Sequence, residues 1–210
     1  MFTGIITNLG VLKQIINTPN QDTLITILLN IPLNHNEKQA RNLEIGCSIA
    51  CNGICLTLIK KNQLEDQKFE LDFQASQETI NKTNIHKWKI GEIINIEFSL
   101  KIGDELGGHL VSGHIDETVE ICNILAVKDS WQFYFSLTAS NKQFIAPKGS
   151  ATINGVSLTV NEASQNSFMI NIVPHTFENT NFKYCKIGDL CNLEVDLIAR
   201  YLANLLKNNN

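Results

Sequence analysis

Asn52-Gly-Ile-Cys-Leu-Thr-Leu58 decides the fold, because Asn154-Gly-Val-Ser-Leu-Thr-Val160 repeats it 102 residues later. In both stretches an Asn-Gly pair, which tolerates positive φ in a tight turn, precedes a run that alternates apolar and polar residues. This pattern predicts a hairpin turn followed by a half-buried β-strand. Its recurrence indicates that one structural unit is encoded twice.

Further matches follow in the same order along the chain. Lys89-Ile-Gly-Glu-Ile-Ile-Asn-Ile-Glu97 is echoed 97 residues later by Lys186-Ile-Gly-Asp-Leu-Cys-Asn-Leu-Glu194. The openings Thr3-Gly4-Ile5 and Ser112-Gly113-His114 match more weakly. Between them lie short runs rich in Ile, Phe and Thr, several with period two, which indicate β-strands. Strands of this length and spacing predict an all-β chain of two tandem, similar, closed β-barrels.

The tail is the exception to the β pattern. From Asp196, a residue suited to a helix N-cap, apolar residues follow helical spacing: Leu197, Ile198, Tyr201, Leu202, Leu205 and Leu206. So short a helix is not stable alone in water. We expect this C-terminal α-helix to dock either on its own domain or on another copy of the chain.

Composition indicates a folded protein. Of the 210 residues 43% are hydrophobic and 18% charged, which excludes wholesale disorder. The net charge is −4 with scattered Lys and Arg, so no footprint for nucleic acid or an anionic membrane is present. Residues 1–6 lack the pattern of a secretory signal, and the apolar run 24–29 is far too short for a membrane span. We expect a soluble, cytoplasmic protein.

Six cysteines in such a chain favour free thiols over a disulfide framework. Cys47, Cys51 and Cys55 recur every four residues, whereas zinc knuckles more often place two residues between ligands. No second Cys or His pair follows at a suitable distance. We therefore expect no metal.

Small polar residues recur on the repeated strand. Cys55 and Thr57 are predicted on one face with Leu56 on the other, and Ser157 and Thr159 repeat this arrangement. Two such groups suit hydrogen bonding to a flat polar heterocycle; the alternative is a polar strand face exposed to solvent. In Gly107-Gly-His-Leu-Val-Ser-Gly-His114, the two histidines should face opposite sides. His114, which follows Gly113, is either structural or presented to a cleft.

Four stretches identify the family: Met1–Ile5, Asn52–Thr57, Gly107–His114 and Gly155–Thr159 resemble the riboflavin synthase family, with order and spacing held over residues 1–206. The resemblance implies six strands per barrel, with domains at 1–97 and 98–195, and an oligomerisation helix and tail at 196–210. It implies a homotrimer that pairs the first barrel of one chain with the second of its neighbour, and association with lumazine synthase. The implied reaction is the dismutation of two 6,7-dimethyl-8-ribityllumazine molecules to riboflavin and 5-amino-6-(D-ribitylamino)uracil, without metal or redox cofactor.

The resemblance also implies two substrate pockets. The first-barrel pocket would use Gly4, Ile5, Ile6, Ser48, Cys55, Leu56, Thr57, Gln74, Ala75, Ser76, Gln77, Glu78 and Thr79. The second-barrel pocket would use Gly113, His114, Ile115, Lys148, Ser157, Leu158, Thr159, Ile172, Val173, Pro174, His175, Thr176 and Phe177. In this second pocket Asn154 and His175 depart from the family's usual Asp and Glu, which should alter its donor and acceptor pattern.

The reaction needs a base for the C7 methyl of one lumazine and a nucleophile, water included, for C7 of the other. An imidazole titrates near neutral pH, so His114 is the candidate proton shuttle. Ser48, Cys55, Thr159 and Asp196 are further catalytic candidates without assigned roles. The alternatives are a lumazine-binding antenna protein that does not turn its ligand over and, more weakly, a flavin barrel like that of ferredoxin reductases, although no nicotinamide-binding domain follows.

Overall fold

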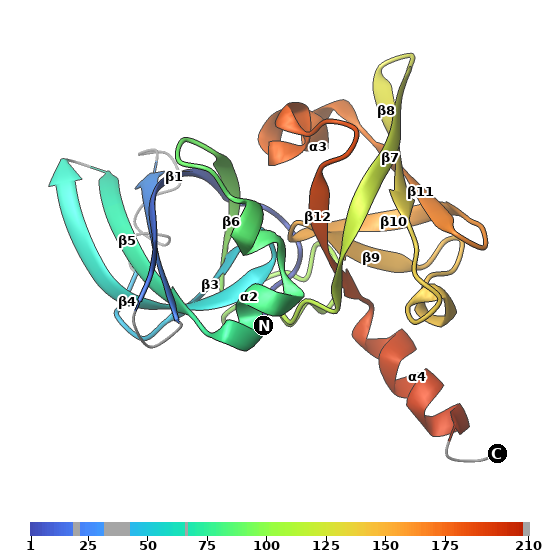
Figure 1. Cartoon of the computed structure of the whole chain (residues 1–210), viewed down its shortest axis with the longest axis horizontal. Coiled ribbons are helices and arrows are strands. Elements are labelled where there is room, and N and C mark those ends of the chain that lie inside the picture. The colour runs from blue at the N-terminus through green and yellow to red at the C-terminus, as the bar shows by residue number, and fades with distance from the viewer. Residues whose placement is uncertain (19–21, 32–42, 66, 208–210) are drawn as a thin grey trace.

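The computed structural model describes residues 1–18, 22–31, 43–65 and 67–207. Its strands form two closed six-stranded barrels that lie side by side, and helix α4 (Leu197–Lys207) projects from the second barrel (Figure 1). All strand pairs within the barrels are antiparallel. The predicted fold class, two similar antiparallel barrels and a C-terminal helix, is confirmed.

The two barrels have the same strand order. The first closes in the order β1-β2-β5-β4-β3-β6, from β1 (Asn8–Asn17), β2 (Thr23–Asn30), β3 (Ser48–Cys51), β4 (Ile54–Glu65), β5 (Lys68–Ala75) and β6 (Ile93–Phe98). The second repeats it as β7-β8-β11-β10-β9-β12, from β7 (Glu117–Val127), β8 (Ser130–Ser136), β9 (Ser150–Ile153), β10 (Val156–Ala163), β11 (Ser167–Ile172) and β12 (Leu190–Val195).

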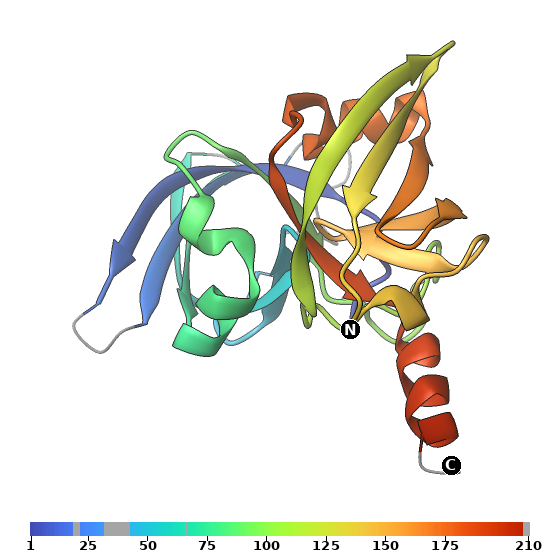
Figure 2. The same ribbon diagram turned by 45° about the vertical axis from the view of Figure 1, so that its right-hand side comes forward.

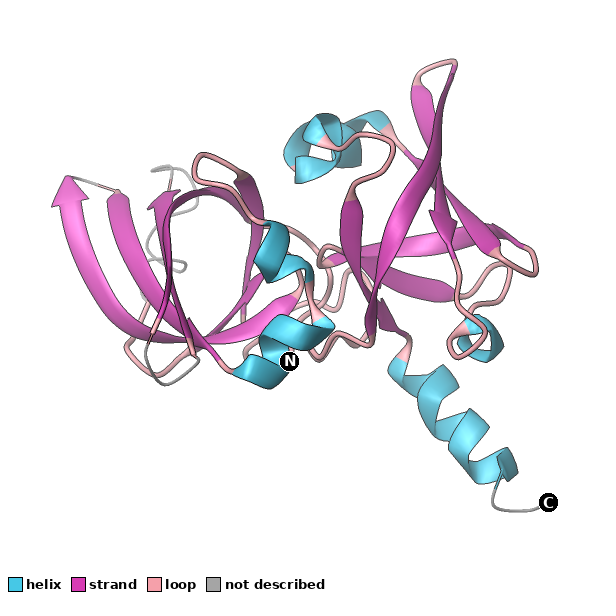
Figure 3. Cartoon of the chain, in the orientation of Figure 1, coloured by secondary structure: helices cyan, strands magenta, loops and turns pink. Residues whose placement is uncertain are grey.

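Short helices occupy equivalent connections in the two barrels (Figure 3). Helices α2 (Gln77–Lys82) and η2 (Asn84–Lys87) link β5 to β6, and α3 (Pro174–Asn179) and η4 (Asn181–Tyr184) link β11 to β12. A further turn, η3 (Lys142–Phe144), precedes β9. Each barrel encloses its own apolar core, aliphatic-rich in the first and built around a cluster of Phe rings in the second.

The two Asn-Gly turns meet where the barrels touch. Their φ angles are 47° and 79° at Asn52 and Gly53, and 47° and 83° at Asn154 and Gly155, which confirms the predicted turns. A Cβ on Gly53 would lie 2.6 Å from the backbone nitrogen of Gly155, and one on Gly155 would lie 2.7 Å from that of Gly53. The contact is therefore reciprocal, as across a two-fold axis, and it is too close for any side chain.

Buried asparagines join the barrels around these turns. Asn95 Nδ2 donates to the carbonyl of Asn154 at 2.9 Å, and Asn192 Nδ2 donates to the carbonyl of Asn52 at 2.9 Å. Asn181 Nδ2 donates to Asn52 Oδ1 at 3.1 Å. The Asn154 side chain accepts the backbone N–H of Asn192 inside this network. The expectation that Asn154 alters the second pocket is therefore wrong: it belongs to the joint between barrels.

Helix α4 does not pack its apolar stripe on its own barrel. Asp196 Oδ1 accepts the N–H of Ile198 at 2.9 Å, as expected of an N-cap. Yet Ile198, Tyr201, Leu202, Leu205 and Leu206 are 55–67% exposed, and the helix points away from both barrels (Figure 2). Within the described part of the chain, no helix has the length and apolar character to cross a membrane.

Candidate functional site

The repeated strands present matched polar faces outside the two cores. In the first barrel Ser48 pairs with Thr57, and Ala50 pairs with Cys55, across β3 and β4. Leu56 points into the core at 3% exposed, so the predicted alternation along β4 is confirmed. The second barrel repeats the face on β9 and β10, as the cross-strand pairs Ser150–Thr159 and Thr152–Ser157.

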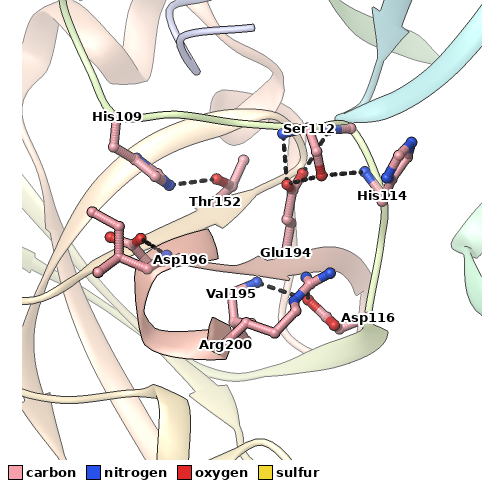
Figure 4. Close-up of polar contacts among 11 residues, drawn as sticks. His109, Ser112, His114, Asp116, Thr152, Glu194, Val195, Asp196 and Arg200 are labelled. Atoms are coloured by element: carbon pink, nitrogen blue, oxygen red, sulfur yellow. Dashed lines mark hydrogen bonds and ion pairs between the residues drawn. The ribbon is translucent and has the colours of Figure 1, made fainter. Parts of the chain in front are cut away.

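Two opening segments, 1–6 and 107–116, run between these faces. Phe2 and Val111 form an antiparallel bridge that ties the segments to each other. Each segment is also clamped by a buried glutamate of its own half. Glu97 accepts from Thr3 and Gly4, and Glu194 accepts from Ser112 Oγ at 2.6 Å and from the N–H of Gly113 at 2.9 Å (Figure 4). This equivalence explains the weak sequence match between the openings.

Beyond the clamp, each segment docks on the other half. The N–H of Ser157 donates to the carbonyl of Gly4 at 2.8 Å, and the N–H of Cys55 donates to the carbonyl of Gly113 at 2.8 Å. Ile6 packs on the second core and Ile115 on the first. These contacts are the opposite of the predicted assignment of residues 4–6 to the first pocket and 113–115 to the second, because the end of each segment reaches the other barrel. A sequence match identifies equivalent residues, but not which neighbour they contact.

The first site is a cavity of about 220 Å³. It brings together six of the residues predicted for the two pockets: Cys55, Glu78, Thr79, Gly113, His114 and Ile115. The side chain of His114 is exposed, and its ring has no hydrogen-bond partner among the described residues. The imidazole is thus free to meet a ligand in this cavity.

In the second site a histidine, His109, contacts the hydroxyls of the strand face directly. His109 Nδ1 lies 2.7 Å from Ser157 Oγ, and its Nε2 lies 3.1 Å from Thr152 Oγ1. Burial lowers the pKa of His109, although the negative charge of Asp196 opposes the shift. His109 therefore faces the second barrel and His114 the first, as predicted from their spacing.

Gln74 and Ala75 end strand β5 and Ile172 ends β11, and the helical turns that follow hold further predicted residues of each site. Ser76 caps α2 by accepting the N–H of Thr79 at 3.3 Å. In the second half, the ring of Phe177 stacks on that of Trp131 with centroids 3.8 Å apart. Both rings pack against the core of the second barrel. His175 contacts Asn179 within its own helix: its carbonyl accepts from Asn179 Nδ2 at 2.8 Å.

Lys148 has a strained backbone. Its φ is 69°, whereas the equivalent position of the first barrel is Gly46, with φ 91°. Both residues donate their N–H to the following strand, at Val160 and Leu58 respectively. A lysine in a conformation that favours glycine costs of order 1 kcal/mol or more. Its side chain is exposed, and its backbone is held beside β10 by the bond to Val160.

The start of α4 is tied to the segment that carries His114. Asp116 Oδ2 accepts the N–H of Val195 at 2.9 Å and is 2.8 Å from Arg200 Nη2 (Figure 4). Burial raises the pKa of Glu194, and hydrogen bonds from residues 112 and 113 and the charge of Arg200 oppose the shift. Glu97 shows the same rise from burial, with only hydrogen bonds opposing it.

The cysteines are free thiols in the structure. Burial raises the pKa of the Cys47 and Cys51 thiols, so neither is poised as a thiolate. Among the described residues no group of three or more His, Cys, Asp or Glu side chains is placed to hold a metal.

Sequence reasoning missed several residues of the two sites. Ser150 and Thr152 follow from extending the repeat of β4 and β10 back to β3 and β9. Glu97 and Glu194 stood at the ends of a recognised repeat, but a repeat does not reveal what its residues bind. The partners of His109 had no signal in the sequence.

Comparison with known proteins places this geometry in a family. The lumazine binding domain matches the chain twice, over residues 3–99 and 112–196. The chain is 37% identical to the riboflavin synthase of Brucella abortus (strain 2308), over 98% of both proteins. It is 38% identical to that of Photobacterium leiognathi, over 99% of the chain and 89% of the relative, and 36% identical to that of Escherichia coli (strain K12), over 93% and 87%.

Solved structures share the fold. LumP complexed with riboflavin superposes with a TM-score of 0.78 at 24% identity, covering 93% of this chain and 99% of LumP. LumP complexed with 6,7-dimethyl-8-(1'-D-ribityl) lumazine gives 0.76 at 23%, with the same coverage. With relatives matched over nearly their whole length and a lumazine-binding domain in each half, the chain belongs to the riboflavin synthase family.

Proposed function

We propose that the chain catalyses the dismutation of two 6,7-dimethyl-8-ribityllumazine molecules to riboflavin and 5-amino-6-(D-ribitylamino)uracil, the last step of riboflavin biosynthesis. One lumazine gives up a four-carbon unit and the other accepts it, so the atoms balance without an external oxidant or reductant. The observation that carries the proposal is the doubled site: two polar strand faces, each met by an opening segment, in a chain related over its whole length to riboflavin synthases.

We assign one lumazine to each barrel, with domains at 1–97 and 98–195. In the first site His114 is exposed beside Cys55 and Thr79, where its imidazole can take a proton from the C7 methyl of a bound lumazine. Ser48 and Thr57 lie on the same strand face as Cys55. In the second site Ser157 and Thr159 form the corresponding face. Lys148 is bonded through its N–H to Val160 on the same strand, and the charge of Asp196 acts on His109.

The exposed stripe of α4 supports assembly into a homotrimer through residues 196–210. Five large apolar side chains that face water are too many for an isolated helix, and burying them against copies of the same helix would stabilise the assembly. Such packing would bring the first site of one chain against the second site of its neighbour. Holding two reactants in register is worth roughly 7–11 kcal/mol in favourable cases.

Membership of the family also supports a proposal about where the protein acts and with which protein it associates. We propose a cytoplasmic enzyme, supported by its six free thiols, which are typical of a reducing compartment. We also propose association with lumazine synthase, because that enzyme's product is this one's substrate. Co-sedimentation of the two purified proteins tests the association.

The activity test uses the purified full-length protein, treated with a chelator, and the lumazine alone. Two molecules of lumazine should disappear for each riboflavin formed. A second candidate function, binding without turnover, is favoured by the likeness of fold to LumP. In that case the folded protein would bind the lumazine and leave its amount undiminished, and the catalytic proposal would be wrong.

A further inference from the structure

The chain carries one polar arrangement in the second half that the first half does not repeat. His109 lies between Thr152 and Ser157, with its two ring nitrogens directed at the two hydroxyls. At the equivalent positions of the first barrel stand Ala50 and Cys55, which pair directly across β3 and β4.

The backbone around His109 holds the imidazole in place. A Cβ on Gly108 would lie 2.1 Å from the carbonyl oxygen of Thr3 and 2.9 Å from Ser157 Oγ, so only glycine lets the segment pass here. The N–H of His109 donates to the same Thr3 carbonyl at 3.2 Å. The imidazole is therefore held by its backbone as well as by its two ring contacts.

The buried hydroxyl of Thr152 determines which ring nitrogen carries the proton. Thr152 is 0% exposed, and among the described residues the hydroxyl has one hydrogen-bond partner, His109 Nε2. A buried O–H that donates to nothing is far costlier than an unused lone pair. Thr152 must therefore donate to Nε2, which leaves Nε2 without a proton. In a neutral imidazole the proton then resides on Nδ1.

This tautomer sets the direction of the next hydrogen bond. Nδ1–H donates to Ser157 Oγ at 2.7 Å, so the hydroxyl of Ser157 acts as acceptor toward His109. Its own hydrogen has no partner among the described residues and is left to point into the site. A hydrogen bond that is accepted also strengthens the one that is donated.

We propose that His109 is a positioning residue that, through the relay Thr152 to His109 to Ser157, makes Ser157 an obligate hydrogen-bond donor to the bound heterocycle. The atom that it selects is a carbonyl oxygen or an unprotonated ring nitrogen. The first site has no such relay, because Ala50 offers no hydroxyl and a thiol such as Cys55 is a weak donor. The identity of the heterocycle rests on the proposed function; the direction of the relay does not.

The first test is spectroscopic and needs no turnover. In full-length protein labelled with 15N-histidine, with the signals of His109 assigned by their loss in His109→Gln, Nδ1 should carry the proton and Nε2 should be bare. Thr152→Val should move the Nε2 resonance toward that of a bare nitrogen without a hydrogen bond. Thr152→Ser, which keeps the hydroxyl, should not. A wild-type signal with the proton on Nε2 would overturn the proposal.

The second test measures the binding of 6,7-dimethyl-8-ribityllumazine by fluorescence. His109→Leu should weaken one class of lumazine site by about tenfold, the value of one oriented hydrogen bond, and leave the other class unchanged. His109→Gln, whose amide can accept from Thr152 and donate to Ser157, should restore most of the loss. His86→Gln is the histidine control for the second site, because its ring contacts the carbonyl of Thr83 at 3.1 Å, beside the first site, and neither Thr152 nor Ser157.

Equal weakening of both classes, or no change in either, would contradict the relay. If His109→Leu does not fold, the comparison of Thr152→Val with Thr152→Ser gives the same reading. A wild-type protein that forms no riboflavin but shows the proton on Nδ1 would remove the proposed function and leave the relay standing.

Discussion

In the first barrel Cys55 pairs with Ala50 and meets the segment that carries His114; in the second, Ser157 pairs with Thr152 and meets His109. The strands, turns and clamping glutamates around these residues are equivalent in the two halves. Duplication has therefore kept the scaffold and changed the polar groups. The proposed reaction gives two identical molecules unlike roles, since one gives up a fragment and the other receives it, and unlike polar groups in the two sites fit these roles.

The largest expected effect tests whether the two unlike sites must meet across chains. Leu202→Asp combined with Leu206→Asp charges the exposed stripe of α4 and keeps Arg200 in place. The full-length variant should sediment as a monomer and lose roughly 10³-fold or more of its turnover, because its two lumazines are no longer held together.

Ile90→Asp is the control, since Ile90 is 73% exposed but lies outside α4. Its sedimentation and turnover should match those of the wild type. A charged-stripe variant that is monomeric and fully active would show that the two sites meet within one chain.

The next effect separates the two opening segments. His114 and its sequence equivalent, Ile5, occupy matching positions, but only His114 can move a proton. His114→Gln should lower turnover about 10²-fold and leave lumazine binding largely intact. Ile5→Ala should change turnover far less. Steady-state rates and fluorescence titration measure both, and near-normal turnover of His114→Gln would make this residue structural.

The buried asparagines that join the barrels form equivalent hydrogen bonds in the two halves, so equivalent substitutions there should lower stability equally. Asn95→Ala leaves the backbone N–H of Asn181 and the carbonyl of Asn154 without this side chain as partner. Asn192→Ala does the same to Asn84 and Asn52. Each should lower the free energy of unfolding by about 2 kcal/mol, measured by urea denaturation. Unequal losses would show that the joint is not symmetric in energy.

The smallest effect compares the two clamping glutamates. Arg200→Ala removes a charge that holds down the pKa of Glu194, so this pKa should rise further while that of Glu97 stays the same. The folded pKa of each lies above its ordinary value of 4.5, so its contribution to stability is full below that pH and falls as the pH rises through the folded pKa.

As the pH rises from about 4.5 to about 7.5, Arg200→Ala should therefore lose more free energy of unfolding than the wild type does. Loss of the partly exposed ion pair with Asp116 should lower the free energy of unfolding of the variant by up to about 1 kcal/mol more. Carboxyl 13C titration and denaturation at both pH values measure this. Lys183→Ala, which breaks a surface pair with Glu178, is the control and should leave both glutamates unchanged.

The sequence predicted the parts of the molecule that depend on local pattern. The Asn-Gly turns, the alternation around Leu56 and the N-cap at Asp196 were recognisable because each needs only its neighbours along the chain. The repeat then predicted two similar barrels. The pairing of Gly4 with Ser157 was not recognisable, because nothing in a local pattern states which barrel a segment will touch. Nor was the burial of Asn154, since turn residues are ordinarily exposed.

The crossing of the opening segments makes the chain equivalent to a domain-swapped dimer joined into one polypeptide. Each half holds its own segment by a glutamate and lends the end of that segment to the other half. A single half would therefore have an incomplete site, and two copies of it could complete each other only by association at sufficient concentration. The covalent link between the halves replaces that concentration by a fixed local one. It also frees each half to diverge, which two identical copies could not do.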